Sequence, residues 1–460
     1  MTASIAPGIF RQYDIRGVVG DDLTDVAAEA IGRAYAALLR ERGITGAVVV
    51  GRDNRPSGRM LRDALVQGLV AGGADVVDIG VGPTPVMYWA LHHLPVVGGI
   101  QITGSHNPPE FNGFKCCVGT GSLHSEGLQR LRALLDAAPA ATRGTVRHED
   151  VHARYAADIV ARTGPLGRRL KVVFDAGNGA GGPLTEAIFG AMDVDATFLY
   201  TESNGTFPNH HPDPTVPENL EDLVAKVAEV GADFGVAFDG DADRIGVVDD
   251  RGTIVWGDHL LILYARDVLA RTGAGQAIIF DVKCSQALPD AIAAAGGVPV
   301  MWKTGHSLIK DKMKELRAPV AGEMSGHMFF VEGFYGHDDA LYAAARLLRI
   351  VAAEPRPLRA HFDDVPHFVA TPELRFACDD DRKFAVVADA VAHFSALREV
   401  SAVDGARVLY GDGWGLIRAS NTQPILVLRF EALTAARRDE IRAEFEAWLR
   451  SRGVEPVLTH

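Results

Sequence analysis

The stretch that sets the fold class runs from residue 47 to residue 79 and reads AVVVGRDNRPSGRMLRDALVQGLVAGGADVVDI. Its β-branched run at 47–50 predicts a strand that ends at Gly51–Arg52–Asp53, and its Ala/Leu-rich part at 58–72 predicts a helix. Residues 75–79 predict the next strand. A strand, a turn, a helix and a second strand in this order are typical of a parallel α/β unit.

The same order of elements occurs twice more along the chain. A strand is expected at 170–174, followed by a glycine-rich turn and a helix at 183–192. A further strand is expected at 277–280, followed by a helix at 286–295 and a strand at 298–302. Recurrence at intervals of about a hundred residues predicts three related α/β domains.

The pattern changes after Pro366, where short strands and two helices replace the α/β units. The strands are expected at 371–376, 407–410, 415–419 and 425–431, and the helices at 381–394 and 434–450. This part is therefore predicted to be a smaller α+β domain. A polar, Ala/Pro/Thr-rich stretch at 137–150 is interpreted as a linker, and a strand ends in a turn near 249–252. The predicted domains are 1–150, 151–252, 253–367 and 368–460.

Length and composition bound the class of protein. The 460 residues exceed what one hydrophobic core usually serves, and 47% hydrophobic with 23% charged residues is ordinary for a globular protein. The net charge of -13 and the lack of any Lys/Arg cluster argue against nucleic acid or an anionic membrane as a partner. The sequence shows no signal-like leader and no apolar run of about 18 residues, so we expect a cytoplasmic protein. Nothing in it points to an obligate protein partner.

A loop at Thr103–Pro109, with the sequence TGSHNPP, offers Ser105 as a nucleophile. The same residue types also form plain turns for backbone reasons. The loop is not a G-x-S-x-G nucleophile elbow, because Asn107 stands where the second glycine belongs. His106 is adjacent in sequence and so is poorly placed to act as the base of a hydrolase triad.

A second loop carries three carboxylates at alternate positions, in the sequence DGDADR at 239–244 between two strand-like runs. Asp239, Asp241 and Asp243 can converge on one hard cation. An EF-hand would need glycine where Arg244 stands, and helices on both sides. The loop is therefore predicted to bind Mg²⁺, with coordination positions left open for phosphate oxygens.

Two further loops carry polar side chains suited to a sugar phosphate. In the sequence GEMSGH at 322–327, Glu323 and Ser325 can both point at neighbouring sugar hydroxyls, although a surface turn would look the same. In the sequence RASNTQP at 418–424, a guanidinium, hydroxyls, an amide and backbone N–H groups suit a phosphate. A hairpin turn would explain Asn421 and Pro424 there but gives no reason for Arg418.

One motif points to a different reaction class. Residues 177–182 read GNGAGG, which fits G-x-G-x-x-G directly after a strand, and Glu202 follows about twenty residues later. An NAD-dependent oxidoreductase is therefore an alternative interpretation. It leaves the three-aspartate loop and the loops of Ser105 and Arg418 without a role.

Taken together, the four loops resemble the α-D-phosphohexomutase family, particularly its bacterial phosphomannomutase/phosphoglucomutase branch. TGSHNP, DGDADR and GEMSGH stand in the family's order along essentially the whole chain. The resemblance implies four domains around one central cleft. It also implies reversible phosphoryl transfer between the 1- and 6-positions of mannose and glucose phosphates, through a phosphoserine and a hexose 1,6-bisphosphate that also serves as activator. A sugar-phosphate-binding protein without mutase activity is the second alternative.

The resemblance also assigns roles to single residues. Ser105 would carry the phosphoryl group and bind Mg²⁺ together with Asp239, Asp241 and Asp243, while Glu323 and Ser325 would hold sugar hydroxyls. The non-transferring phosphate would be bound by Arg418, Ser420, Asn421 and Thr422. Further active-site positions match at Tyr13, Arg16, His106, Lys115, Arg244, Lys283, His306 and His327. Arg16 and Lys115 would be cations for the transferred group, and Lys115 or His327 would accept the proton of the attacking hydroxyl.

Overall fold

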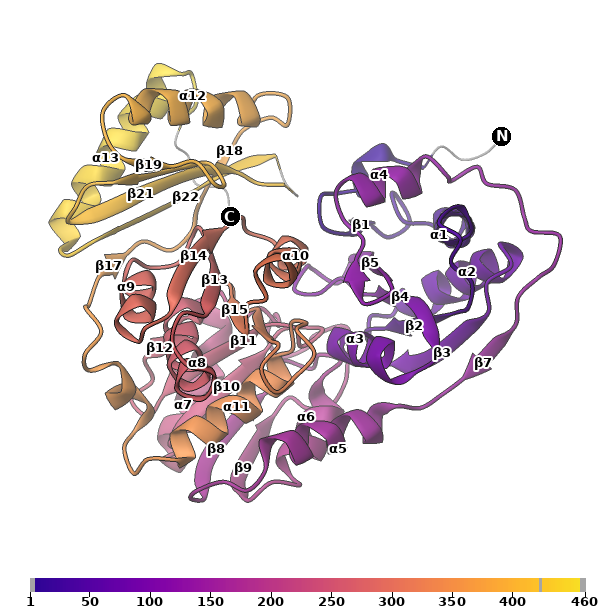
Figure 1. The fold of residues 1–460 in the computed structure, drawn as a ribbon, viewed down its shortest axis with the longest axis horizontal. Helices are drawn as coiled ribbons and strands as arrows, with labels where there is room; N and C mark the ends of the chain where they lie inside the picture. The colour runs from indigo at the N-terminus through magenta and orange to yellow at the C-terminus, as the bar shows by residue number, and fades with distance from the viewer. Residues whose placement is uncertain (1–4, 422–423, 456–460) are drawn as a thin grey trace.

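The computed structural model of the chain describes residues 5–421 and 424–455. It contains four sheets, which follow one another along the chain. The N-terminal part, drawn in indigo, and the C-terminal part, drawn in yellow, face each other across the top of the molecule in Figure 1. The middle of the chain forms the base between them. Three α/β domains followed by an α+β domain are what the sequence predicts, and this fold class is confirmed.

The first sheet has the order β1-β5-β4-β2-β3-β7, with β6 paired to β5. Its strands are β1 (Ile15–Val18), β2 (Ala47–Arg52), β3 (Val76–Val81), β4 (Val96–Ile102), β5 (Phe111–Val118), β6 (Gly121–Ser122) and β7 (Val146–His148). The α-helices of this part are α1 (Asp25–Glu41), α2 (Gly58–Ala71), α3 (Thr84–His93) and α4 (Glu126–Arg132). β2 runs parallel to both β3 and β4, as expected for an α/β unit.

The interpretation of residues 137–150 as a linker is corrected by β7. This strand pairs in parallel with β3 and forms the edge of the first sheet. Its three residues, VRH, are all exposed. A short exposed edge strand has no buried face, so it leaves no alternation of apolar and polar residues by which the sequence could reveal it.

The second sheet has the order β12-β11-β10-β8-β9. Its strands are β8 (Leu170–Asp175), β9 (Val194–Leu199), β10 (Phe234–Phe238), β11 (Ile245–Asp249) and β12 (Ile254–Val255), and its helices are α5 (His152–Thr163), α6 (Gly182–Phe189) and α7 (Glu221–Val230). β10 and β11 are antiparallel, so the aspartate loop is the turn of a buried hairpin. β12 extends this sheet past residue 252, where the sequence predicts a domain boundary.

The third sheet has the order β14-β13-β15-β16. Its strands are β13 (Ala277–Asp281), β14 (Val298–Trp302), β15 (Val320–Gly322) and β16 (Met328–Phe330). Its helices are α8 (Gly257–Thr272), α9 (Ala287–Ala294), α10 (His306–Leu316) and α11 (Ala340–Ala352). The predicted sugar loop connects β15 to β16, which are antiparallel.

The fourth sheet is antiparallel, with the order β17-β22-β21-β20-β19 and β18 also paired to β22. Its strands are β17 (Val369–Ala370), β18 (Leu374–Ala377), β19 (Val400–Ser401), β20 (Ala406–Leu409), β21 (Gly413–Ala419) and β22 (Ile425–Ala432). The helices α12 (Lys383–Ser395) and α13 (Ala435–Ser451) pack on it through Phe394, Phe445 and Trp448. Arg418, the first residue of the predicted phosphate loop, lies in β21, within the strand expected at 415–419.

One hydrophobic core runs through the first three domains. Trp89 on α3, Tyr155 on α5 and Tyr342 on α11 belong to the same buried cluster. The fourth domain has a core of its own. It contacts the third domain through a small cluster that includes Val282, Trp414 and Leu416. The fourth domain is therefore the one whose apolar attachment to the rest of the chain is smallest.

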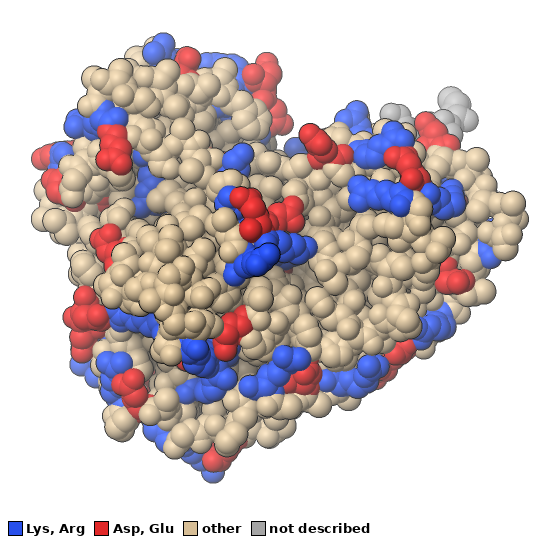
Figure 2. Space-filling view, viewed as in Figure 1, with Lys and Arg blue, Asp and Glu red and all other residues tan. Residues whose placement is uncertain are grey.

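The surface drawn in Figure 2 carries acidic and basic side chains in small, interspersed groups. The same view shows a notch between the fourth domain and the first. Among the described residues, no helix is long and apolar enough to cross a bilayer. All four cysteines are buried and free of disulfides.

Candidate active site

A cleft of about 1450 Å³ is lined by residues from all four domains. The predicted site residues that line it are Tyr13, Arg16, Ser105, His106, Lys115, Arg244, Lys283, His306, Glu323, Ser325, His327, Arg418, Ser420 and Asn421. Asp239, Asp241 and Asp243 lie buried beneath the cleft. Thr422 falls outside the described residues. Loops that are far apart in sequence therefore converge on one cavity.

Ser105 lies in the connection between β4 and β5 and is 2% exposed. Its hydroxyl donates to Oδ2 of Asp239 over 3.0 Å and lies 3.1 Å from Nδ1 of His106. Ser105 has a φ of +49°, which is unusual for a residue other than glycine. Such a backbone conformation persists where the surroundings fix it, and it is common at functional sites.

The three aspartates of the β10–β11 turn form one cluster. They are 0% exposed, and one carboxylate oxygen of each lies within 4.8 Å of those of the other two. Oδ1 of Asp241 and Oδ1 of Asp243 are buried without a hydrogen-bond partner. Burial, together with the neighbouring Asp241 and Asp243, raises the pKa of Asp239 well above its usual value. Buried, partly unpartnered carboxylate oxygens fit a hard divalent cation.

Lys115 on β5 is the counter-ion of this cluster. Its Nζ donates to Asp241 over 2.9 Å and also contacts Asp243. Burial alone would lower the pKa of the Lys115 ammonium, but the two carboxylates outweigh it and raise the pKa. Thr103 donates to the same Asp241 oxygen over 3.1 Å. Lys115 is therefore charged in this arrangement, as required of a cation beside a transferred phosphoryl group.

His327 lies between Arg244 and a carboxylate that the sequence analysis did not select. Nε of Arg244 donates to Nε2 of His327 over 3.0 Å, which places the imidazole proton on Nδ1. That Nδ1 lies 3.2 Å from Oδ2 of Asp338, and Nδ1 of His306 lies 3.6 Å from the same oxygen. Lys310 donates to the other oxygen of Asp338 over 3.0 Å. One buried carboxylate thus faces two of the three predicted histidines, His306 and His327.

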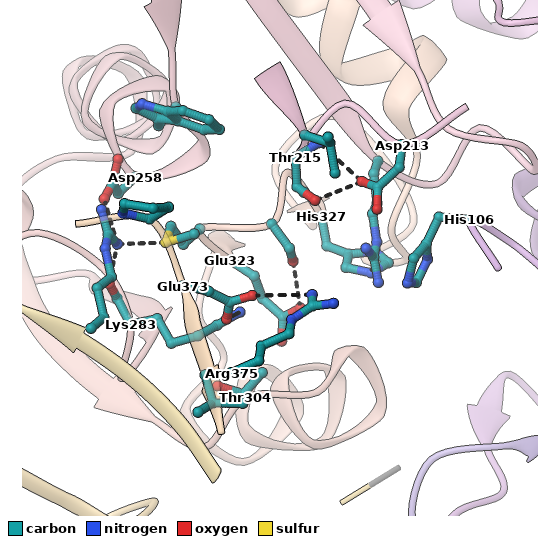
Figure 3. Close-up of a pocket in the computed structure, with 18 of the residues that line it drawn as sticks. His106, Asp213, Thr215, Asp258, Lys283, Thr304, Glu323, His327, Glu373 and Arg375 are labelled. Carbon is teal, nitrogen blue, oxygen red and sulfur yellow. Dashed lines mark hydrogen bonds and ion pairs between the residues drawn. The ribbon is translucent and has the colours of Figure 1, made fainter. Parts of the chain in front are cut away.

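The β15–β16 loop places a carboxylate in the middle of the cleft. Glu323 is 3% exposed and accepts hydrogen bonds from the backbone N–H of Gly305 over 2.5 Å and from the Ser325 hydroxyl over 3.3 Å. Burial raises the pKa of Glu323. In Figure 3, Glu323 lies between the side of the cleft that carries His327 and the side that carries Lys283. Lys283 pairs there with Glu373 over 3.0 Å.

The predicted phosphate cradle joins three domains. Nε of Arg418 donates to Asp404 over 2.9 Å. Nδ2 of Asn421 donates to the hydroxyl of Tyr13 over 2.7 Å, and that hydroxyl donates to the carbonyl of Thr304 over 2.6 Å. Asp404 also accepts from the backbone N–H of Thr304 over 3.1 Å. Asp404 therefore holds one edge of the guanidinium of Arg418, and among the described residues no hydrogen bond is made by its two terminal nitrogens.

The glycine-rich turn that suggested a dinucleotide site is filled by the chain itself. The N–H of Ala180 donates to the carbonyl of Gly240 over 2.8 Å. A Cβ at Gly179 would lie 2.9 Å from that carbonyl oxygen, and one at Gly182 would lie 2.1 Å from the carbonyl oxygen of Thr201. The glycines permit this close approach of backbone to backbone. The turn supports the aspartate loop, and the oxidoreductase interpretation finds no support.

Three functional neighbours escaped the sequence analysis. Asp338 faces His327, and Asp404 accepts a hydrogen bond from Arg418. Neither aspartate is close in sequence to its partner. Asp338 has one signal, because it and Asp339 precede the wholly apolar start of α11. The third is Arg55, which lies between the strand end predicted at Gly51–Arg52–Asp53 and the helix predicted from residue 58.

Comparison with known proteins agrees with the geometry. Four family models match in order: Phosphoglucomutase/phosphomannomutase alpha/beta/alpha domain I at residues 7–138, domain II at 153–252, domain III at 256–368 and the C-terminal domain at 373–447. Phosphomannomutase/phosphoglucomutase of Pseudomonas aeruginosa is 47% identical over 454 residues, covering 97% of this chain and 96% of that protein.

Two further comparisons cover nearly the whole chain. Phosphoglucomutase of Neisseria gonorrhoeae is 45% identical over 455 residues, covering 98% of each protein. The crystal structure of a phosphoglucomutase/phosphomannomutase family protein from Burkholderia thailandensis superposes with a TM-score of 0.90 at 44% identity, covering 97% of this chain and 98% of that one. The resemblance identified from the four loops is confirmed, and the chain belongs to the phosphoglucomutase/phosphomannomutase family.

Proposed function

We propose that this protein is a phosphomannomutase/phosphoglucomutase, which moves a phosphoryl group reversibly between the 1- and 6-positions of mannose and glucose phosphates. The observation that carries the proposal is the hydroxyl of Ser105, 3.0 Å from the buried three-carboxylate turn. It lines the same cleft as the Arg418 cradle of the fourth domain. A protein that only binds sugar phosphates needs the cradle but has no use for a nucleophile beside such a turn.

At one end of the cleft, Ser105 would accept and return the phosphoryl group. Asp239, Asp241 and Asp243, with the phosphorylated Ser105, would hold Mg²⁺, which supplies charge neutralisation at the phosphoryl oxygens when bound. Arg16, whose Nη1 donates to the carbonyl of Gly104 over 2.8 Å, adds a cation next to the serine. His106 and His327 complete this end. Of the two predicted proton acceptors, Lys115 and His327, His327 would take the proton, because the charged Lys115 has no lone pair to accept one.

At the other end, the chain would hold the sugar and the phosphate that is not transferred. Glu323 and Ser325 would bind sugar hydroxyls. The phosphate would be bound by Arg418, Ser420, Asn421 and Thr422. Tyr13, Arg244, Lys283 and His306 would make further contacts to the substrate. A hexose 1,6-bisphosphate formed by the first transfer would turn end for end and return its other phosphate to Ser105. Added bisphosphate would act as the activator.

The proposed setting is the cytoplasm, with hexose phosphates as partners and no obligate protein partner. The proposed domain boundaries are those predicted from the sequence, after residues 150, 252 and 367, although the short strand β12 beyond residue 252 still pairs with the second sheet. The small apolar contact of the fourth domain supports closure of the cleft around the substrate, which would keep water from the phosphoserine. Exclusion of water is what separates a mutase from a phosphatase with the same serine.

Turnover with glucose 1-phosphate and with mannose 1-phosphate should differ by no more than about tenfold, which is ~1.4 kcal/mol in transition-state binding. The reason is that Glu323 and Ser325 would contact hydroxyls that the two sugars share, and the sugars differ only at the 2-position. A coupled assay that detects each 6-phosphate product, with and without glucose 1,6-bisphosphate, measures this. A larger preference for one of the two sugar phosphates would contradict dual specificity but not mutase activity. If neither sugar phosphate were converted, the proposed function would be wrong.

Arg418→Ala should raise the KM for 1- and 6-phosphates alike, by about 10- to 100-fold, because it removes charge-assisted hydrogen bonds worth about 1.5–3 kcal/mol. Ser105 should still accept phosphate from saturating glucose 1,6-bisphosphate. Arg359→Ala is the matched control, since Arg359 lines the same cleft but pairs with Asp250. Steady-state kinetics of both variants test the assignment. Equal KM values for Arg418→Ala and the unmodified protein would remove Arg418 from the phosphate site.

A further inference from the structure

Arg55 lies in the turn after β2 and uses every N–H of its guanidinium inside the protein. Its side chain is 0% exposed. Nη2 donates to the carbonyls of Ser105 over 2.8 Å and Asn107 over 2.5 Å. Nη1 donates to the carbonyls of Pro108 over 2.5 Å and Phe111 over 3.1 Å. Nε donates to Asp53 over 3.2 Å, which accounts for all five donors.

Asp53 extends the same network to the other side of the serine. Its Oδ2 accepts from the backbone N–H of Gly104 over 3.0 Å, and its Oδ1 accepts from the N–H of Arg55 over 3.0 Å. The N–H of Ser105 itself donates to Oγ1 of Thr103 over 2.8 Å. The pair formed by Asp53 and Arg55 therefore fixes the Thr103–Gly104 peptide unit and the peptide unit that follows Ser105. Arg16 and Thr103 hold the peptide unit between them, directly before Ser105.

This network explains how Ser105 can keep φ at +49°. Serine adopts that conformation only where its surroundings fix it. Gly104 makes the close approach possible, because a Cβ there would lie 2.4 Å from the guanidinium carbon of Arg55. With the backbone held in this form, the hydroxyl of Ser105 reaches Oδ2 of Asp239.

The same turn also fixes the first domain against the second. Nδ2 of Asn54 donates to the carbonyl of Asn178 over 2.7 Å. The ring of Phe207 covers the guanidinium of Arg55, with 5.2 Å between the guanidinium carbon and the ring centroid. A Cβ at Gly205 would lie 2.3 Å from the carbonyl oxygen of Asn54, so the two backbones are in contact. Ser105 belongs to the first domain and the aspartate loop to the second, and this turn touches both.

We propose that Arg55, oriented by Asp53, is a positioning residue that holds Ser105 in the conformation from which it accepts and transfers the phosphoryl group. The inference rests on the proposed function. Arg55 does not touch substrate, because it is buried and all its donors are used within the chain. Its effect on the reaction passes through the carbonyls of the serine loop.

Arg55→Lys tests the proposal because lysine keeps the charge opposite Asp53 but cannot place donors on four carbonyls at once. We expect kcat to fall by about 10²-fold, the effect of a misplacement of about 1 Å at a reacting group. The KM for glucose 1-phosphate should stay within about twofold, since the sugar and phosphate loops are untouched. Single-turnover phosphorylation of Ser105 by glucose 1,6-bisphosphate, followed by intact mass, should slow in proportion to kcat.

The matched control is Arg52→Lys, at an arginine of the same turn, whose side chain makes one long hydrogen bond of 3.4 Å to the carbonyl of Asp53 within the described part of the chain. It should leave kcat and phosphorylation unchanged. Asp53→Asn gives a second variant, expected to reduce kcat less than Arg55→Lys, and it keeps the test open if that variant does not fold. A lowered melting temperature with normal kcat and normal phosphorylation of Ser105 would reduce Arg55 to a structural residue. An unmodified protein without turnover would instead overturn the proposed function, and this inference with it.

Discussion

Ser105→Ala should lower turnover of glucose 1-phosphate by about 10⁴-fold or more, the size of loss seen when a covalent nucleophile is removed. Binding of the sugar phosphate should change by no more than a few-fold, because the Glu323 loop and the Arg418 cradle lie on other domains. Steady-state kinetics and isothermal titration with glucose 6-phosphate measure the two effects separately. In a protein that only binds sugar phosphates, Ser105→Ala would leave binding unchanged and there would be no turnover to lose.

The backbone at Ser105 allows a strict control. Alanine carries the same Cβ as serine, so Ser105→Ala adds no strain at φ of +49°, whereas Ser105→Gly relieves it. Both variants lack the hydroxyl and should be equally inactive, although the glycine variant should be at least as stable. After the protein without substitutions is incubated with glucose 1,6-bisphosphate, peptide mapping should place phosphate on Ser105. Phosphate found only on another residue, or near-normal turnover in Ser105→Ala, would end the phosphoserine mechanism.

The sequence predicts which polar side chains come together where they lie in short, contiguous motifs. The three aspartates are one turn of one hairpin, so their alternate spacing already shows that they can face a common point. Glu323 and Ser325 share one loop in the same way. A tight turn fixes the relative placement of its own residues, and the family resemblance then supplies the order of the turns along the chain.

The parts that the sequence did not reveal depend on contacts between distant elements. Asp404 is joined to Thr304, and Asp338 to His306, only after the sheets have been assembled. Arg55 donates to backbone carbonyl oxygens, which every residue has. No pattern of side chains in the sequence can therefore indicate its partners. At the glycine-rich turn at 177–182, the sequence instead suggested a dinucleotide site for which the structure gives no support. The glycines of this turn are explained by close packing of backbone against backbone, which a sequence pattern cannot distinguish from an approach to a pyrophosphate.

Asp239→Asn should abolish the magnesium dependence of the protein while leaving the loop intact. Oδ1 of Asp239 accepts from the backbone N–H groups of Asp243 over 3.0 Å and Arg244 over 3.1 Å, and the amide oxygen of asparagine can accept both. What disappears is one negative charge of the cation site. Loss of a metal that contributes several kcal/mol to the transition state corresponds to a fall in turnover of about 10³-fold.

The same substitution should stabilise the metal-free protein. Lys115 pairs with Asp241 and Asp243 but not with Asp239, so the uncompensated charge of the cluster falls on Asp239. Because the folded state raises the pKa of Asp239, metal-free protein should lose stability as pH rises from the unfolded value of about 4 through the raised pKa. Asparagine does not titrate, so the variant should keep that stability. Each kcal/mol recovered corresponds to a rise of about 1 °C in melting temperature for a cooperative unit of this size.

Melting curves with and without Mg²⁺ therefore give a readout that is independent of activity. The unmodified protein should gain stability on adding Mg²⁺, by about 2.7 kcal/mol at a hundredfold excess over Kd, and Asp239→Asn should gain little. Asp249→Asn is the matched control, because Asp249 is a buried carboxylate of the same cleft that also accepts two backbone N–H groups but lies outside the cluster. It should keep the full response to Mg²⁺. An Asp239→Asn protein that Mg²⁺ stabilises as strongly as the unmodified one would show that the ion binds elsewhere, and the raised pKa would then reflect repulsion that no metal relieves.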